Sequence, residues 1–470
     1  MPAEPTSTDL AGPVRLGAYR PGSTDLRRLV RLALPIAFVQ VGMMAMGALD
    51  TVMVGRVSAA DLAAVAIGNL YFFGIAVFGM GVLYALDPIV SQAVGASDSV
   101  GIARGMQRGG VMALGLTAMA MALLLPAGSF LSFARQPAEV VPIAAGYAHG
   151  LIAGVFPFYA FIVLRQSLQS MGRVRAIVIT VVAANVLNLF LNWVLIFGNL
   201  GAPRLGAVGS AWGTSASRWF MMATLAALGW PLLRDSLRPL RRDAWALAPL
   251  LRILGVGAPI GAQQWLEFGV FGAAGLLMGW MGTVAVASHQ VALQLAALTF
   301  MIPVGVAQAT SVIVGQAVGR GDPHGARRAV GAGLVTGVGF MAFTAVLFLG
   351  LPEPLSRLFS DDADVVAVAA ALLPIAGVFQ VFDGLQVVAA GALRGIGDTR
   401  VPMILILVGF WLIGLPICFL LGFTLGVGPS GIWWGLATGI GVVGILLAWR
   451  IVRRFGRELR RLVIDEAGLS

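Results

Sequence analysis

The sequence predicts an all-α polytopic membrane protein, with twelve transmembrane helices arranged as two parallel six-helix repeats. Three observations lead to this fold class. The composition is too apolar for a soluble domain. Twelve segments are each long enough to cross a bilayer. The two halves of the chain also resemble each other at a constant offset, which indicates an internal duplication.

The composition is that of a chain surrounded by lipid. Of the 470 residues, 59% are apolar and 11% are charged, whereas about 25% of the residues in a soluble protein are charged. There are 62 glycines, a residue that transmembrane helices tolerate well. A soluble chain of this composition would precipitate, so the lipid bilayer is the expected environment.

Twelve segments contain the roughly 20 apolar residues that a membrane-spanning helix needs. They are residues 30–54, 62–86, 109–132, 141–169, 176–198, 208–232, 253–280, 285–312, 329–351, 366–392, 401–425 and 430–450. The fourth, seventh and tenth are long, which predicts that they are tilted or kinked. Pro157, Pro259 and Pro374 lie within these three segments or near their ends.

The positive charges are distributed by loop. All 31 basic residues are arginine; 26 of them are assigned to the N-terminal arm, the even-numbered connections and the C-terminal tail, against four in the odd-numbered connections and Arg218 inside a span. Arginine accumulates on the cytoplasmic side of membrane proteins. This predicts a multi-pass protein of the cell membrane, expected to be a bacterial inner membrane, with both termini cytoplasmic. Charges spread over loops do not form a nucleic-acid site, and no obligate protein partner is inferred.

These spans divide the chain into five parts. They are a flexible cytoplasmic arm, a first lobe of six helices, a cytoplasmic linker, a second lobe of six helices and a cytoplasmic tail, at residues 1–26, 27–233, 234–252, 253–450 and 451–470. The arm is rich in Pro, Gly, Ser and Thr and lacks an apolar core, which is typical of a mobile terminus.

The two lobes align at an offset of 224 or 225 residues. The matched segments are "SQAVGASDSVGIAR" (91–104) with "GQAVGRGDPHGARR" (315–328), "LQSMGRVR" (168–175) with "LRGIGDTR" (393–400), and Gln40 with Gln264. Because each repeat holds six spans, an even number, both repeats enter the membrane in the same sense. Transporters use such repeats, with the substrate site between the halves. A duplicated bundle without transport activity is the alternative.

Three carboxylates are predicted to lie inside the membrane: Asp50, Glu267 and Asp383. A charge at mid-helix costs about 2.5–3.5 kcal/mol on insertion scales, so such residues face the bundle interior or a wet cavity and are functional by default. A structural acid that a neighbouring helix keeps neutral is the alternative for each of them.

Asp50 and two asparagines are expected at similar depth. Counted at 1.5 Å per residue, Asp50 lies 19 residues past Arg31, about 28 Å above the cytoplasmic face. Asn188 and Asn192 lie 13 and 17 residues past Arg175, about 20 and 25 Å above it. The two asparagines are four residues apart, hence on one helix face. A carboxylate and two amide oxygens can bind Na⁺ or accept hydrogen bonds from a protonated acid. We predict an ion-coupling site here, and a metal site only if the ion is Na⁺; interhelical hydrogen bonding is the alternative.

The second lobe has its own polar group. Gln263 lies four residues before Glu267, and Gln380 and Gln386 lie three residues either side of Asp383, so each set shares a helix face. The same spans carry the aromatic residues Trp265, Phe268, Phe271, Phe379 and Phe382. Acids with aromatic rings suit an organic cation. We therefore predict that Glu267, Asp383, Gln263 and Gln380 bind substrate, with ordinary apolar packing as the alternative for any single ring.

No cofactor other than the coupling ion is expected. The one cysteine, Cys418, can form no internal disulfide and is expected to be a small buried apolar residue. The three histidines are far apart in sequence and have no metal-ligand spacing.

Four motifs carry a family resemblance: "LDTVMVG" (49–55), "SHQVALQ" (288–294), "GQAVGRGD" (315–322) and "ALRGIGDTRVPM" (392–403). Together they resemble the multidrug and toxic compound extrusion (MATE) family, in its NorM-like bacterial branch, over about residues 25–455. The resemblance implies two six-helix lobes around a central cleft, and efflux of organic cations in exchange for inward Na⁺ or H⁺. It also implies an ion site at Asp50, Asn188 and Asn192, and acids of the second lobe at Glu267 and Asp383.

The predicted function is therefore secondary active antiport by alternating access of two lobes, exporting organic cations such as drugs and toxic compounds, and not enzyme catalysis. A two-lobe flippase of lipid-linked precursors is the nearest alternative, and it would need a strongly cationic cavity. A membrane enzyme would need clustered His, Cys or Asp residues, and a passive channel would not transport uphill. The residues do not decide between Na⁺ and H⁺.

Overall fold

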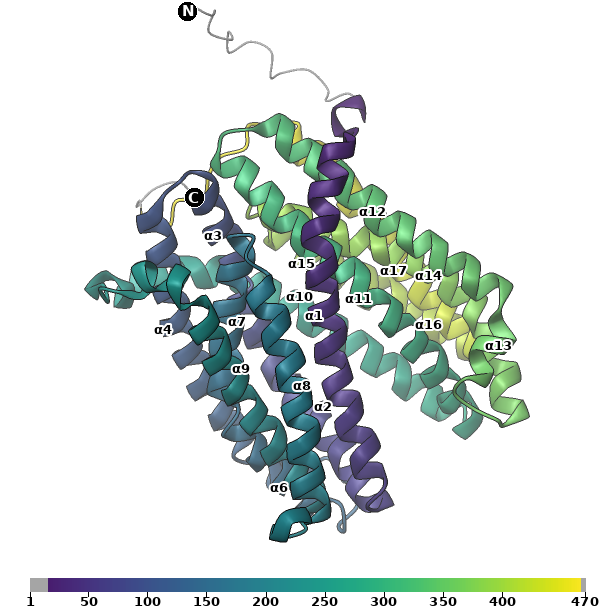
Figure 1. Cartoon of the computed structure of the whole chain (residues 1–470). Coiled ribbons are helices and arrows are strands. Elements are labelled where there is room, and N and C mark those ends of the chain that lie inside the picture. Colours follow the sequence, from purple (N-terminus) through teal and green to yellow (C-terminus); the bar gives the residue numbers. More distant parts are fainter. Residues whose placement is uncertain (1–15, 466–470) are drawn as a thin grey trace, which may run out of the picture. The chain divides into compact units, whose positions relative to one another are not determined.

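The computed structural model describes residues 16–465, which are mainly helical and contain no strand (Figure 1). The α-helices are α1 (Ser23–Gly55), α2 (Ala59–Leu83), α3 (Leu86–Gly95), α4 (Ser99–Leu124), α5 (Ala127–Phe133), α6 (Val141–Ile152), α7 (Val155–Ser170), α8 (Arg175–Phe197), α9 (Gly206–Leu237), α10 (Leu247–Trp280), α11 (Thr283–Gly319), α12 (Pro323–Gly350), α13 (Pro352–Arg357), α14 (Ala363–Gly395), α15 (Arg400–Ile406), α16 (Leu415–Phe419) and α17 (Pro429–Phe455). Two π-helical segments, 407–414 and 420–424, continue α15 and α16.

The prediction of an all-α polytopic membrane protein is confirmed. Within residues 16–465, nine helices are long and apolar enough to cross a membrane, or ten if the bent pair α6 and α7 is one span. The two other predicted spans correspond to α9 and α10, which are 32 and 34 residues long. These two helices are more polar because they carry residues such as Arg218, Gln263 and Glu267.

The fourth predicted span is kinked, as its length indicated. It consists of α6 and α7, which are bent by 48° at a short break. Pro157 lies in the first turn of α7, where a missing backbone N–H leaves no helical hydrogen bond unmade. The bend therefore comes between two helices rather than from a proline inside one of them.

The third predicted span, 109–132, is wrong at both ends, since α4 runs from Ser99 to Leu124. The helix starts early because the Asp98 side chain accepts a hydrogen bond from the Gly101 N–H at 2.8 Å, which caps its first turn. Arg104 and Arg108 are consequently on a helix and not in a connection.

Arg165 is a second correction to the loop assignment. It lies within α7 and is only 2% exposed. Its guanidinium donates to Gln40 Oε1 at 3.0 Å and to the Tyr84 hydroxyl at 3.1 Å. Polar side chains on neighbouring helices thus solvate a cation that the charge pattern had assigned to the cytoplasmic surface.

The described residues form two compact units. The first-repeat unit contains residues 38–90, 98–265 and 464–465, and the second-repeat unit contains residues 16–37, 91–97 and 266–463. In Figure 1, α8 and α9 of the first-repeat unit run side by side, as do α12 and α14 of the second. The predicted lobe boundaries stay a prediction. Residues 1–15 of the predicted arm and 466–470 of the tail lie outside the described residues, while 16–26 hold a short 3₁₀ helix, Leu16–Tyr19, and the first turn of α1.

Equivalent residues of the two repeat motifs pack against each other within the second-repeat unit. A Cβ added to Gly95 would lie 2.1 Å from the backbone oxygen of Gln316, and one added to Gly319 would lie 2.0 Å from that of Gln92. Gly95 and Gly319 are equivalent at the offset of 224, as are Gln92 and Gln316. Each glycine therefore meets the other repeat's glutamine, which is the reciprocal pattern that a two-fold relation requires.

A second pair of approaches follows the same offset. In the first-repeat unit, a Cβ on Gly81 would lie 2.5 Å from Gly261 Cα; in the second-repeat unit, one on Gly305 would lie 2.6 Å from the Ala37 backbone nitrogen. Gly81 is equivalent to Gly305, and Ala37 to Gly261. Small residues thus let helix backbones approach closely, as is common in membrane bundles.

The C-terminal tail is held against the first-repeat unit. Asp465 accepts from Arg108 Nη2 at 2.6 Å and from Arg104 Nη1 at 3.0 Å, and the Ile464 carbonyl accepts from Arg252 Nη1 at 2.7 Å. Ile464 also packs on the cluster of Ala85, Ile89 and Ile253. Burial by itself would raise the pKa of the Asp465 carboxyl. The hydrogen bonds and charges of Arg108 and Arg104 have the larger combined effect, so the pKa is lowered.

Replacing Gly95 with alanine should destabilise the protein by about 1–3 kcal/mol, the usual cost of overpacking, because the new Cβ would overlap the Gln316 backbone. Gly339→Ala is the matched control, since a Cβ there meets no atom within 4 Å and alanine suits a helix interior better. Thermal unfolding of the purified variants is the measurement. Equal stabilities would show that the backbones are not in close contact.

Replacing Asp465 with asparagine should release the tail and raise hydrogen exchange of residues 456–465 several-fold at pH 7. Because the folded pKa of Asp465 is lowered, its stabilising contribution is complete above the unfolded pKa of about 4 and is lost as pH falls through the folded value. The control is Glu458→Gln, which neutralises a tail carboxylate that pairs with exposed Arg460. Equal exchange in both variants would contradict the role given to Asp465.

Candidate functional site

Asp50 lies in a cluster of hydrogen-bonding side chains in the first-repeat unit. It sits on α1 and is 3% exposed. Asn192 Nδ2 on α8 donates to Oδ1 at 2.5 Å, and Thr214 Oγ1 on α9 donates to Oδ2 at 2.8 Å. Asn192 Nδ2 is also 3.3 Å from Asn188 Oδ1. The structure therefore brings Asp50, Asn188 and Asn192 together.

Helix geometry explains how α8 and α9 reach the carboxylate. Asn188 and Asn192 are one turn apart on α8, and both are fully buried. On α9, the residue before Thr214 is Gly213, where a Cβ would lie 2.6 Å from Asn192 Oδ1. A side chain at this position would separate the two helices, so the glycine allows both Asn192 and Thr214 to contact Asp50.

Thr214 is a member of the site that sequence reasoning missed. It lies in "GSAWGTSAS" (209–217), a stretch of small residues that is typical of helix packing in membranes. A threonine hydroxyl both donates and accepts, so Thr214 can serve Asp50 in either protonation state. The one signal in the sequence was its position four residues before Arg218, the single arginine assigned to the interior of a span.

The cluster also contains unused hydrogen-bonding capacity. Asn188 Nδ2 and Asn192 Oδ1 are buried and have no hydrogen-bond partner among the described residues. Since the oxygen and nitrogen of an amide can exchange places by rotation, each asparagine can present either a donor or an acceptor. With the Thr214 hydroxyl and the carboxylate, these oxygens fit a hard cation such as Na⁺, and they fit a protonated acid equally well.

Arg218 adds a positive charge near this cluster. It is 9% exposed, and its guanidinium carbon lies 4.5 Å from the ring centroid of Phe72 and 5.0 Å from that of Phe158. Within residues 16–465 its side chain makes no hydrogen bond or ion pair, although Asp50 acts on it electrostatically. An ionised Asp50 offsets this cation, so a proton or Na⁺ bound at Asp50 would remove that counter-charge from Arg218.

The second-repeat unit has its own pair of acids. Glu267 on α10 is partly buried, and Asp383 on α14 is 8% exposed. The two carboxyl groups are near enough to interact electrostatically, and Gln386 Nε2 donates to Glu267 Oε1 at 2.8 Å. Two like charges in a buried site disfavour each other, so a bound cation or a proton relieves the repulsion.

Aromatic rings form a buried cluster in the same unit. The Phe271 ring centroid lies 6.1 Å from that of Phe379 and 6.4 Å from that of Phe410, and Phe379 lies 5.9 Å from Trp433. Trp265, in contrast, groups with the first-repeat unit; it is 51% exposed and donates to the Gly74 carbonyl at 3.1 Å. Of the five aromatic residues singled out from the sequence, Phe271 and Phe379 are the two that pack on each other.

Gln380, one of the two glutamines predicted to bind substrate, is hydrogen-bonded to threonines of neighbouring helices. Gln380 Oε1 accepts from Thr344 at 2.6 Å and its Nε2 donates to Thr299 at 2.7 Å, so its amide joins α14 to α12 and α11. Gln263 is 6% exposed and groups with the first-repeat unit. Gln386, which the sequence placed on the face of Asp383, donates to the other acid, Glu267.

Comparisons with known proteins agree with this architecture. The MatE family model matches residues 35–194 and 259–420, two segments whose starts differ by the same 224 residues. The chain is 36% identical over 450 residues to the probable multidrug resistance protein NorM of Rhizobium meliloti, covering 93% of this chain and 95% of that protein. It is 36% identical over 456 residues to the multidrug resistance protein PmpM of Pseudomonas aeruginosa, with coverages of 94% and 95%.

Solved structures share the fold. The crystal structure of the eukaryotic MATE transporter AtDTX14 superposes with a TM-score of 0.85 at 22% identity, covering 93% of this chain and 98% of that one. The Vibrio cholerae MATE transporter VcmN in its bent form gives a TM-score of 0.81 at 19% identity, with coverages of 92% and 97%. At these identities the likeness concerns the fold alone.

A duplicated helical membrane protein with buried carboxylates in each repeat unit is of the transporter class and not an enzyme. The family match extends over both repeats, and the relatives match over nearly their whole length. The chain belongs to the MatE family, and its resemblance to the NorM-like branch is confirmed.

Replacing Thr214 with valine should lower the free energy of unfolding by about 1–3 kcal/mol, because one buried carboxylate oxygen would lose its donor without a change of side-chain shape. Thr214→Ser keeps the hydroxyl and should cost less than half as much. Denaturation of both variants in detergent is the measurement. A Thr214→Val variant as stable as Thr214→Ser would contradict the contribution given to the bond with Asp50, because only valine lacks the hydroxyl.

Proposed function

We propose that this chain is a secondary active antiporter that exports small organic cations in exchange for inward Na⁺ or H⁺, by alternating access of its two lobes. The relatives are named multidrug resistance proteins, which supports drugs and toxic compounds as the exported class. The observation that carries the proposal is the buried Asp50 carboxylate, held by Asn192 and Thr214 beside unpartnered amide atoms.

Asp50 can couple ion binding to helix packing. In the present arrangement both of its oxygens accept hydrogen bonds, from α8 and from α9. A proton on either oxygen would turn an acceptor into a donor, and Na⁺ would need oxygen atoms where Asn192 now presents its N–H. Either ion requires Asn192 or Thr214 to rotate, so the ion-bound and ion-free forms favour different packings of α1, α8 and α9. Coupling requires such a difference in affinity between two conformations.

Glu267 and Asp383 are the proposed ligands for the exported cation. Their mutual repulsion is relieved by one positive charge, and the nearby aromatic residues give an organic cation apolar contact. Gln386 Nε2 donates to Glu267 Oε1 at 2.8 Å and so helps to position this carboxylate. Gln263 and Gln380 stay predicted substrate-binding residues, with Gln380 held by Thr344 and Thr299.

The proposed orientation places both termini in the cytoplasm of a bacterial inner membrane. It rests on the excess of arginine in the arm, the even-numbered connections and the tail, and Arg453 and Arg454 in the last turn of α17 belong to that set. The small organic cation and the lipid bilayer are the proposed partners; the coupling ion takes the place of a cofactor.

A flippase of lipid-linked precursors is the second candidate, and one observation favours it. Arg218 is a buried guanidinium without an ion pair among the described residues, and such a group could attract a phosphate. The acids Asp50, Glu267 and Asp383 oppose it, because three buried carboxylates disfavour an anionic substrate. The antiport proposal accounts for more of the buried charge.

Replacing Asp50 with asparagine should abolish gradient-driven transport while leaving expression and membrane insertion intact. The measurement is uptake of a fluorescent organic cation into inverted membrane vesicles, with Na⁺ and H⁺ gradients imposed separately. Wild-type uptake against the cation's gradient should depend on one of the two ions and fall to background in Asp50→Asn.

The control is Asp361→Asn, a carboxylate exposed to solvent, which should transport like the wild type. Undiminished driven uptake in Asp50→Asn would contradict coupling at this residue. Uptake that ignores both gradients would contradict antiport and favour the flippase.

A further inference from the structure

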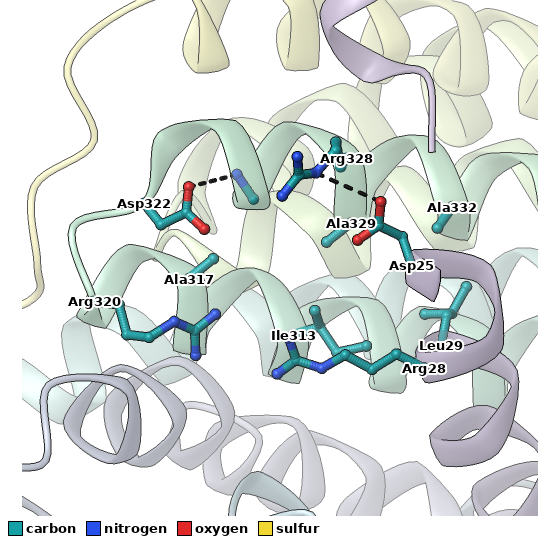
Figure 2. A pocket seen from close by; sticks show the side chains of 11 residues that line it. Asp25, Arg28, Leu29, Ile313, Ala317, Arg320, Asp322, Arg328, Ala329 and Ala332 are labelled. Atoms are coloured by element: carbon teal, nitrogen blue, oxygen red, sulfur yellow. Dashed lines mark hydrogen bonds and ion pairs between the residues drawn. The ribbon is translucent and has the colours of Figure 1, made fainter. Parts of the chain in front are cut away.

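A separate charged cavity lies in the second-repeat unit, where the start of α1, the end of α11 and the start of α12 meet (Figure 2). Its volume is about 50 Å³, several times the roughly 10–15 Å³ that one water molecule needs. The charged residues that line it are Arg28, Arg320, Arg328, Asp25 and Asp322. The three guanidinium groups outnumber the two carboxylates, so the cavity favours an anion.

Both carboxylates are already engaged. Asp322 Oδ1 accepts from the Gly325 N–H at 2.7 Å and caps α12. Asp25 Oδ2 lies 3.5 Å from Arg328 Nε, and both interactions are drawn as dashed lines in Figure 2. Among the described residues neither acid forms an ion pair with Arg28 or Arg320, although Asp25 attracts Arg28 electrostatically.

Arg320 is the cation without a partner. Within residues 16–465 its side chain makes no hydrogen bond or ion pair, and no dashed line reaches it in Figure 2. Arg28 donates to Gln316 Oε1 at 3.0 Å, an uncharged acceptor. Arg28 and Arg320 are also near enough for their charges to repel. An anion in the cavity would pair with both and remove that repulsion.

We propose that this cavity binds the phosphate group of an anionic phospholipid. A guanidinium presents two parallel N–H donors that match phosphate oxygens, and Arg28 and Arg320 supply two such groups from different helices. The position at the ends of α1, α11 and α12 is that of the headgroup layer, where arginines attract anionic lipids. Only the choice of the cytoplasmic leaflet rests on the orientation proposed above.

An apolar surface for the acyl chains continues from the cavity along α12. Val335 is seven residues after Arg328, two turns further along the same helix face, and is 57% exposed. Phe343 and Val346 follow at 60% and 66% exposed. A headgroup in the cavity would thus leave its chains beside exposed apolar side chains, a contact that free phosphate could not make.

Native mass spectrometry of the full chain tests the proposal. Phosphatidylglycerol or phosphatidylcholine is added to delipidated wild type, Arg320→Gln and Arg175→Gln. Arg175 is the matched control, an exposed arginine at the start of α8 whose side chain has no hydrogen bond or ion pair to the rest of residues 16–465. Arg320→Gln removes a group with no internal partner, so the variant should fold, and its thermal unfolding is compared with that of the wild type.

We expect the wild type to bind one phosphatidylglycerol more tightly than phosphatidylcholine. The affinity for phosphatidylglycerol should be about tenfold weaker in Arg320→Gln, as for the loss of one charge-assisted hydrogen bond. It should be unchanged in Arg175→Gln. Competition by millimolar inorganic phosphate would overturn the lipid assignment and make the site one for free phosphate. Equal weakening in both variants, or no preference for phosphatidylglycerol, would overturn the anion site itself.

Discussion

The hydrogen-bonded carboxylate of Asp50 is the constraint around which the first-repeat unit is arranged. A buried charge in lipid is costly unless neighbouring groups solvate it, and here the solvating groups come from α8 and α9. Those helices can both reach the carboxylate because Gly213 lets them approach. The same requirement helps to explain why α9 is too polar to resemble an ordinary span, since it carries Thr214, which donates to the acid, and the buried Arg218. In the proposed mechanism, stability and ion coupling therefore depend on the same few bonds.

The duplication has preserved the scaffold but not the chemistry. The close approaches at Gly95 and Gly319, and at Gly81 and Gly305, recur at the offset of 224. The acids do not: at the offset of 224 the equivalent of Asp50 is Ala274 and that of Glu267 is Met43, and at the offset of 225 that holds for α14 the equivalent of Asp383 is Phe158. A larger side chain at any of these glycines would push two helix backbones apart, so the contacts tolerate little substitution. A single polar side chain can be replaced without moving a backbone. Two similar units can thus carry different sites, one suited to a small ion and the other to an organic cation.

Much of this arrangement follows from periodicity and depth. Asp50, Asn188 and Asn192 could be grouped from sequence because each depth is counted along one helix and the asparagine spacing fixes a shared face. Thr214 could not be found that way, since its contact with Asp50 depends on the rotation of a third helix. Gln380 shows the converse error: it has the spacing of a partner for Asp383, but its amide contacts Thr299 and Thr344. Sequence spacing identifies the face of a helix, and only tertiary packing determines which neighbour that face meets.

The attachment of the tail links the first-repeat unit to a late part of the chain. Arg108 is 2% exposed, and the carboxylate that neutralises it belongs to Asp465, 357 residues further on. During synthesis the ribosome must therefore translate the whole second repeat before this cation acquires its counter-charge. Until then the starts of α4 and α10 lack the contacts that Ile464 and Asp465 make with them. A nascent chain interrupted within the second repeat leaves the first one incomplete, which gives proteolytic quality control a means of distinguishing unfinished molecules from finished ones.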